Sequence, residues 1–165
     1  MGKYFAVVAL FVSALCFSSI LARKTPALDK FFVEGKIYCD PCHFAFESRL
    51  SFPLEGVKVS LQCLRSENDT VTYVKEGKTD ANGQYSIPVH GDHEEEICIV
   101  VADSPTEGQC KEAMPNKSDR IVLTKNMGVS SMARYVNPLG FMTLGIDATQ
   151  CNLVVQELGL DQLDN

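Results

Sequence analysis

The cysteines of this chain constrain its fold more than any other feature, because one of the seven lies in an apolar leader and six follow it. The leader carries Lys3, runs apolar to Cys16 and reaches small residues by Ala22. A basic start, a short apolar core and small residues before a polar segment are typical of a secretory signal peptide. We therefore predict a signal peptide over residues 1–22, with cleavage after Ala22.

Removal of the leader takes Cys16 with it and leaves an even set of cysteines. These are Cys39, Cys42, Cys63, Cys98, Cys110 and Cys151. An even set in an oxidising compartment indicates three disulfides, although sequence alone does not choose among the possible pairings. Removing 22 of the 165 residues leaves 143, which is the length of one domain. We expect a secreted, cross-linked protein with a single domain over 23–165.

The charge and hydropathy of the chain exclude several classes of partner. Loss of Lys3 with the leader takes the net charge from −6 to −7. A surface this acidic offers few cations to nucleic acid or to an anionic membrane. The apolar leader is shorter than the about 20 residues that span a bilayer, and no second apolar stretch follows it. We expect no nucleic acid as a partner and no membrane insertion.

Two sequons predict N-glycosylation of a secreted chain. One is Asn68-Asp69-Thr70 and the other is Asn116-Lys117-Ser118. Both follow polar, turn-like stretches, so we expect at least one of Asn68 and Asn116 to carry a glycan.

Alternation of apolar and polar residues predicts short β-strands. It is clearest in Val57–Cys63, and the other predicted strands are Phe32–Cys39, Val71–Lys75, Gln84–Val89, Ile97–Ala102 and Arg120–Thr124. Asn82-Gly83 predicts a turn, and 135–142 reads as an irregular apolar segment. A short helix is expected over Cys151–Leu158, with Thr149 as its cap and Gly159 at its end. Short strands with one helix favour an antiparallel all-β sandwich or partly closed barrel.

The order of these strands and turns resembles the prealbumin-like sandwich modules over Val33 to Val101. A more specific resemblance lies in Glu34–His43, which reads EGKIYCDPCH. This segment resembles the signature of the olive major pollen allergen (Ole e I-like) and extensin family, in which Val and Arg stand where this chain has Ile37 and His43. The Thr79–Ser86 turn and the Asn137–Phe141 segment also resemble family features.

The resemblance implies an antiparallel β-barrel or sandwich of about seven strands with a short C-terminal helix, in a plant glycoprotein that is secreted and in many members allergenic. It implies disulfides Cys39–Cys110, Cys42–Cys151 and Cys63–Cys98. It implies no catalytic activity and no cofactor. It connects the chain with pollen hydration, germination and tube growth through extracellular partners, such as a receptor kinase or a cell-wall polymer.

Cys39-Asp40-Pro41-Cys42 is a CxxC motif that thiol oxidoreductases and zinc sites also use. A redox pair needs its first thiol near a helix N-terminus, whereas this motif ends a predicted strand. A zinc ribbon needs a second close pair of cysteines, and the other four are scattered. We therefore favour structural disulfides over redox chemistry and over zinc.

Two segments are candidate recognition surfaces. His43 with Arg49 offers a basic, partner-facing patch. The acidic loop His90–Glu96 offers imidazoles and carboxylates that attract calcium or zinc weakly, although their spacing matches no standard metal site. The three histidines have no local serine or cysteine context that suggests the nucleophile and base of a hydrolase.

Three functions remain in competition at this point. A non-enzymatic extracellular interaction protein agrees best with the acidic, disulfide-bonded, secreted character. The alternative is a carrier that holds a small apolar ligand inside the barrel, because barrels of about eight strands approach the size that encloses one ligand. A thiol oxidoreductase acting through Cys39 and Cys42 is the third.

Overall fold

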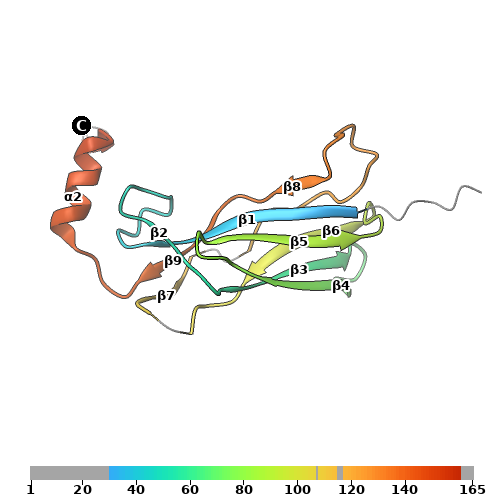
Figure 1. Ribbon diagram of the computed structural model, residues 1–165, viewed down its shortest axis with the longest axis horizontal. Helices are drawn as coiled ribbons and strands as arrows, with labels where there is room; N and C mark the ends of the chain where they lie inside the picture. The colour runs from blue at the N-terminus through green and yellow to red at the C-terminus, as the bar shows by residue number, and fades with distance from the viewer. Residues whose placement is uncertain (1–29, 107, 115–116, 161–165) are drawn as a thin grey trace, which may run out of the picture.

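In the computed structural model, the described residues are 30–106, 108–114 and 117–160, and they form two sheets and one helix (Figure 1). The larger sheet contains β1 (Lys30–Asp40), β2 (Phe52–Pro53), β5 (Gln84–His90), β7 (Cys110–Ala113), β8 (Ala133–Tyr135) and β9 (Leu139–Thr143). The smaller sheet contains β3 (Lys58–Arg65), β4 (Val71–Lys78) and β6 (Glu96–Ala102). The helix is α2 (Ala148–Glu157).

Strand β1 organises the larger sheet because it is long enough to pair with four other strands. Its first half pairs with β5 antiparallel and with β8 parallel, as in the pairs Gly35↔Tyr85 and Glu34↔Tyr135. Its second half pairs with β2 antiparallel and with β9 parallel, as in the pair Ile37↔Leu139. One strand therefore holds together segments from both ends of the described chain.

The smaller sheet is antiparallel, with β3 between β4 and β6. On β3 the side chains of Val59, Leu61 and Cys63 are buried while Ser60 and Gln62 are partly exposed. This alternation is the pattern that the sequence predicts, because successive side chains of a strand point to opposite faces. The predicted strands that correspond to β1, β3, β4, β5 and β6 are confirmed.

The hydrophobic core takes side chains from both sheets. Its fully buried members include Phe31, Val33, Ile37, Val59, Leu61, Ile87, Val89, Val100, Leu123 and Phe141. Burial of each such side chain stabilises the fold by about 1.5–3 kcal/mol relative to exposure. The interior is therefore filled by the protein's own residues.

The predicted mostly-β fold with a short C-terminal helix and three disulfides is confirmed, but of the predicted antiparallel barrel or sandwich the closed barrel and the purely antiparallel arrangement are wrong. The described strands form two open sheets, and β8 and β9 run parallel to β1. A turn at Asp80–Gly83 joins β4 to β5, but no ladder pair connects these two strands in the described part of the chain. A carrier function that needs a closed barrel interior therefore has no structural basis in this fold.

The predicted strand Arg120–Thr124 is also wrong. Ile121 makes one isolated bridge to Cys98, and the segment enters no sheet. The reason is the guanidinium of Arg134, which donates from Nε to the Val122 carbonyl and from Nη2 to the Thr124 carbonyl, both at 3.0 Å. These carbonyls bind a side chain where a strand would offer them to a neighbouring backbone. Conversely, the segment 135–142, which the sequence predicts to be irregular, contains the end of β8 and most of β9.

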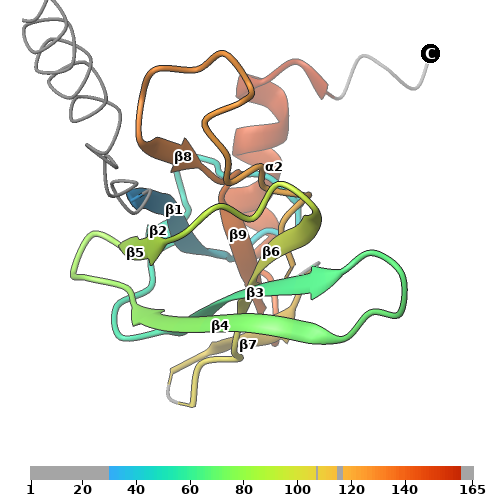
Figure 2. The same ribbon diagram turned by 90° about the vertical axis from the view of Figure 1, so that its right-hand side faces the viewer.

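The helix α2 lies at one end of the molecule, where β1 and β9 end; Figure 2 is viewed from the opposite end. Its N-cap is Asp147, whose carboxylate accepts the backbone N–H groups of Thr149 and Gln150. The predicted cap, Thr149, is therefore inside the helix. Gly159 has a φ of 66° just after the C-cap, so the predicted helix end is confirmed.

Candidate functional site

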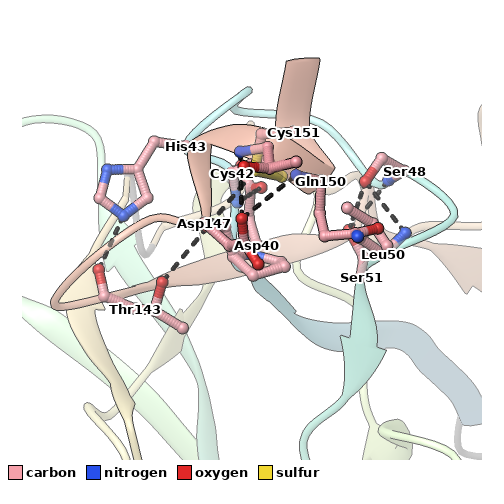
Figure 3. Close-up of a disulfide and its surroundings, with 12 residues drawn as sticks. Asp40, Cys42, His43, Ser48, Leu50, Ser51, Thr143, Asp147, Gln150 and Cys151 are labelled. Carbon is pink, nitrogen blue, oxygen red and sulfur yellow. Dashed lines mark hydrogen bonds between the residues drawn. A yellow bond between two sulfur atoms is a disulfide. The ribbon is translucent and has the colours of Figure 1, made fainter. Parts of the chain in front are cut away.

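The end of the molecule that carries α2 is held to the sheets by the Cys42–Cys151 disulfide (Figure 3). We call residues 41–51 and 144–158 the helical end. The disulfide joins the loop between β1 and β2 to the helix, and Cys151 and Val154 form the buried face of α2. The disulfide is therefore the covalent link between α2 and the loop that follows β1.

The fully buried carboxylate of Asp40 shapes the loop at the start of the helical end. It accepts the backbone N–H of Cys42 at 3.1 Å and that of Ala45 at 2.8 Å (Figure 3). These two bonds support a turn in which His43 and Ala45 have positive φ angles of 59° and 62°. Non-glycine residues adopt this conformation at a cost, so the loop depends on the carboxylate that binds its backbone.

His43 and Arg49 both lie on the helical end, as the sequence predicts, but each has its own partner. His43 Nε2 lies 2.7 Å from the main-chain carbonyl of Thr143. Arg49 Nε donates to Glu157 Oε2 at 2.6 Å, in an ion pair that is exposed on both sides. Both contacts tie the 41–51 loop to the C-terminal part of the chain, so the structure does not join these two side chains into one basic site.

Exposed apolar side chains are numerous on the helical end. Leu144 is 73% exposed, and Phe46, Ile146, Leu153 and Leu158 are each more than 40% exposed. The rings of Phe44 and Phe46 also stack, with centroids 5.4 Å apart. Apolar side chains gathered on one end of a soluble domain are typical of a protein-binding surface.

The acidic loop His90–Glu96 is anchored to the segment 123–126. The His93 N–H donates to the Leu123 carbonyl at 3.0 Å, and the Thr124 hydroxyl donates to Asp92 at 3.2 Å. Asn126 donates from its side chain to Glu94 at 2.6 Å. These bonds hold the loop against that segment, and of its other two carboxylates Glu95 is exposed while Glu96 is partly buried.

His93 forms the buried part of the acidic loop. Its ring packs on Tyr73 with centroids 4.8 Å apart, and its Nδ1 contacts the carboxylate of Glu96. Burial opposes the ionisation of Glu96, but hydrogen bonds from Thr72 and His93, with the charges of His93 and Arg65, hold its pKa below the usual value. Glu96 is thus a carboxylate that the fold keeps ionised.

The structure does not build a metal centre from the predicted loop residues. Among the residues described, the potential metal ligands that converge are Cys63, His93, Glu96 and Cys98, with donor atoms within 4.8 Å of one another. The two sulfurs are bonded to each other as a disulfide, and the imidazole and the carboxylate already contact each other. Two of the four donor atoms are therefore consumed by a covalent bond, while Nε2 of His93 is buried and has no hydrogen-bond partner among the described residues.

The three disulfides are Cys39–Cys110, Cys42–Cys151 and Cys63–Cys98, which are the pairs that the family resemblance implies. Cys63 and Cys98 are direct neighbours across β3 and β6. Because Cys39 and Cys42 are bonded to different distant partners, the CxxC motif is not a dithiol pair. A thiol oxidoreductase acting through these two sulfurs does not agree with this arrangement.

The described histidines also form no nucleophile–base pair. His43 binds a main-chain carbonyl and His93 binds a carboxylate.

No described helix has the length and hydropathy needed to cross a membrane. Asn68 is exposed in the turn between β3 and β4, and its side-chain oxygen accepts the Thr70 N–H at 3.2 Å. Asn116 lies outside the described residues, so glycosylation at both sites stays a prediction.

A polar groove on the larger sheet escaped the sequence analysis. It has a volume of about 560 Å³ and crosses β5, β1 and the end of β8. Its lining includes Glu34, Lys36, Lys78, Gln84, Ser86 and Tyr135. Alternation marks the polar face of β1 and β5, but nothing in the local sequence indicates that Tyr135 lies beside Glu34, because that parallel pair joins residues about 100 positions apart.

The protein-family model described as "Pollen protein Ole e 1 like" matches residues 29–159 of this chain. An Olee1-like protein of Betula pendula is 43% identical over 155 residues, which are 92% of each chain. The anther-specific protein LAT52 of Solanum lycopersicum is 40% identical and covers 93% of this chain and 95% of its own. The pollen allergen Cro s 1 of Crocus sativus is 38% identical and covers 97% of this chain and 96% of its own.

A solved structure agrees with the same assignment. The crystal structure of the major plantain pollen allergen Pla l 1 matches with a TM-score of 0.62 and 31% identity, over 71% of this chain and 96% of that one. The names of these relatives describe pollen or allergenicity, and none of them names a reaction. The chain belongs to the Ole e 1-like family of pollen proteins.

Proposed function

We propose that this chain is a secreted, non-enzymatic pollen glycoprotein that binds an extracellular protein through its helical end. Secretion is supported by the leader over 1–22 and by three disulfides, which form and persist in oxidising compartments. The pollen context is supported by relatives that include an anther-specific protein and pollen allergens. Recognition of this chain by IgE from pollen-allergic donors is part of the same proposal.

The observation that carries the proposal is the exposure of apolar side chains on a segment that a disulfide links to the rest of the fold. Leu144 and Leu153 are exposed on the segment 144–158, and the Cys42–Cys151 disulfide joins this segment to the 41–51 loop. A cross-link restricts the motion of the segment it closes, so less conformational entropy is lost on binding than for an untethered segment. Charges at the rim of this surface, such as Arg49 and Glu157, favour a partner with polar groups around an apolar centre.

The test is binding of labelled mature protein, residues 23–165, to germinating pollen tubes. We expect saturable binding that Leu153→Ser weakens and that Val74→Ser leaves unchanged. Val74 lies on β4 and is 51% exposed, close to the 45% of Leu153, so it controls for the loss of an exposed apolar group. Equal effects of the two substitutions, or no saturable binding, would contradict the proposal.

The class of the partner is decided by treating the pollen-tube surface before the binding assay. If protease removes the binding sites, the partner is a protein, and cross-linking followed by mass spectrometry identifies it; the ectodomain of a receptor kinase is the partner to look for first. If binding survives protease but is lost after digestion of wall polysaccharides, the partner is a cell-wall polymer. In that case the protein-binding proposal fails.

A further inference from the structure

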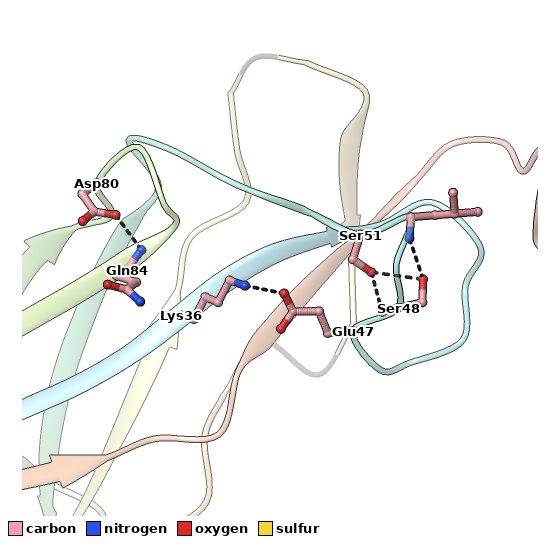
Figure 4. Close-up of polar contacts among 7 residues, drawn as sticks. Lys36, Glu47, Ser48, Ser51, Asp80 and Gln84 are labelled. Atoms are coloured by element: carbon pink, nitrogen blue, oxygen red, sulfur yellow. Dashed lines mark hydrogen bonds and ion pairs between the residues drawn. The ribbon is translucent and has the colours of Figure 1, made fainter. Parts of the chain in front are cut away.

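The polar groove lies on the outer side of the larger sheet, next to the helical end. It is built where β1 is flanked by β5 on one side and by β8 on the other. Figure 4 shows Lys36 reaching from β1 to Glu47 of the 41–51 loop, with Gln84 and Asp80 on the neighbouring strand and turn. The groove is lined by residues of β1, of the end of β4 with the turn after it, of β5 and of 135–138, while Glu47 lies outside it and holds Lys36.

Tyr135 is the most exposed large hydrophobic side chain of the described residues, at 80%. Its backbone is nevertheless fixed, because β8 pairs with β1 and the next residue, Val136, donates its N–H to the Glu34 carbonyl at 2.8 Å. A tyrosine held this way presents a flat apolar face beside a polar groove. Such rings are favoured in binding sites because they bring a large contact area with little loss of side-chain freedom.

The groove also presents hydrogen-bonding groups that the fold leaves available. The Gln84 N–H is bound to Asp80 at 2.9 Å, but its side-chain amide makes no hydrogen bond with any described residue. The Lys78 ammonium likewise forms no ion pair within the described part. Glu34 receives the Ser86 hydroxyl on one carboxylate oxygen at 3.2 Å, and its other oxygen can accept further bonds.

The charges of the groove balance. Two carboxylates, of Glu34 and Asp80, stand beside two ammonium groups, of Lys36 and Lys78. Lys36 is paired with Glu47, and the whole chain carries a net charge of −6. A polyanion gains little from such a surface, whereas a neutral ligand with many hydroxyl groups can bind both the acceptors and the donors.

We propose that this groove binds a neutral oligosaccharide. A pyranose has an apolar face of C–H groups that packs on the Tyr135 ring, and hydroxyl groups that reach the Gln84 amide and the free Glu34 oxygen. The volume of about 560 Å³ lies inside the usual range for small-molecule sites, about 300–1,000 Å³. The groove is distinct from the helical end. The saccharide proposal rests on the proposed secretion, which gives the chain access to wall saccharides, but it does not rest on the proposed protein partner.

The test is a titration of disulfide-bonded, ¹⁵N-labelled residues 23–165 with cellotetraose, xyloglucan heptasaccharide and trigalacturonic acid, followed by two-dimensional NMR. We expect a neutral oligosaccharide to shift the backbone amides of Gly35, Gln84 and Tyr135. Tyr135→Ala should weaken that binding at least tenfold, while Tyr135→Phe, which keeps the ring, should change it less than twofold.

The control is Val74→Ala, which removes another exposed apolar side chain, at 51% exposure, on β4 and outside the groove. It should leave saccharide binding unchanged. Stronger binding of trigalacturonic acid than of the neutral probes, shifts confined to residues outside the groove, or Tyr135→Ala binding as tightly as the parent would each overturn the proposal. Because the assay uses purified protein, failure here leaves the pollen-tube binding experiment unaffected, and the reverse also holds.

Discussion

Gly83 is the position where one added methyl group should test the fold most directly. It has a φ of 72°, and a Cβ placed on it would lie 2.4 Å from the main-chain carbonyl oxygen of Ile37. That oxygen accepts the N–H of Leu54, while the carbonyl of Gly83 accepts the N–H of Ile37 at 2.8 Å. Gly83→Ala therefore pushes apart β1, the turn before β5 and the residue that follows β2.

The expected cost can be separated into two parts. A non-glycine residue at this φ costs about 1–2 kcal/mol, less about 0.4–1 kcal/mol from the reduced freedom of the unfolded chain. Displacing the Ile37 carbonyl weakens two backbone hydrogen bonds, each contributing about 1 kcal/mol. We expect Gly83→Ala to lower the free energy of unfolding by about 3 kcal/mol.

Gly56 is a matched control because it has the same φ of 72° with no atom within 4 Å of the added Cβ. Gly56→Ala should cost only the conformational part, about 1 kcal/mol. The assay is equilibrium unfolding in guanidinium chloride with the disulfides intact, followed by circular dichroism, since the chain has no tryptophan. With a slope of about 4 kcal/mol/M, the midpoints should fall by about 0.8 M and about 0.25 M. Equal shifts would show that the close approach of Gly83 to Ile37 contributes nothing.

Three further predictions concern the acidic loop and the helical end. The pKa of Glu96 is lower in the folded state than in the unfolded chain. Ionisation of Glu96 therefore stabilises the fold fully at pH values above the pKa of the unfolded chain. This stabilisation is lost as the pH falls through the pKa of the folded state. Glu96→Gln should therefore be less stable than the parent at pH 7, and thermal melts at a series of pH values should show the two converging below about pH 4. Asp147→Ala removes the N-cap of α2 and should cost about 1 kcal/mol, seen as faster hydrogen exchange of the helix amides while the strand amides stay protected. Equal exchange in parent and variant would argue against that role. Replacing Cys42 and Cys151 together by serine opens a link between residues 109 positions apart and should cost about 2–5 kcal/mol, measured by the same guanidinium chloride unfolding. An unchanged midpoint would mean that α2 is held without the disulfide.

The sequence predicts a strand such as β3, which has one buried face, and misses β9, which is buried on both faces. Residues 58–65 alternate because β3 has the core on one side, and this alternation is visible in the amino acids. In β9 the residues Leu139, Gly140, Phe141 and Thr143 are all buried. The amino acids of β9 therefore do not alternate between apolar and polar, and the sequence does not reveal the strand. The parallel direction of β9 beside β1 leaves no mark on either segment.

The candidate site shows the same limit. His43, Arg49 and the acidic loop can be nominated from residue type and from their place between predicted strands. Their actual partners are Thr143, Glu157 and the segment 123–126, which are distant in the sequence and fixed only by the tertiary fold. A side chain whose partner is known only after folding can be listed as a candidate, but its role cannot be assigned.

The pairing of the first described strand with the last imposes an order on biosynthesis. On the proposed secretory route, Cys63 and Cys98 are the first native partners to be available together, because Cys98 is synthesised before Cys110 and Cys151. Cys39 and Cys42 must meanwhile stay unpaired, or exchange out of a bond to each other, until Cys110 and Cys151 emerge. Strand β1 cannot complete its ladder before β9 exists. A bond formed early between Cys39 and Cys42 would have to be broken by thiol–disulfide exchange before the two native bridges could form, so the CxxC motif is the place where premature oxidation would trap the chain.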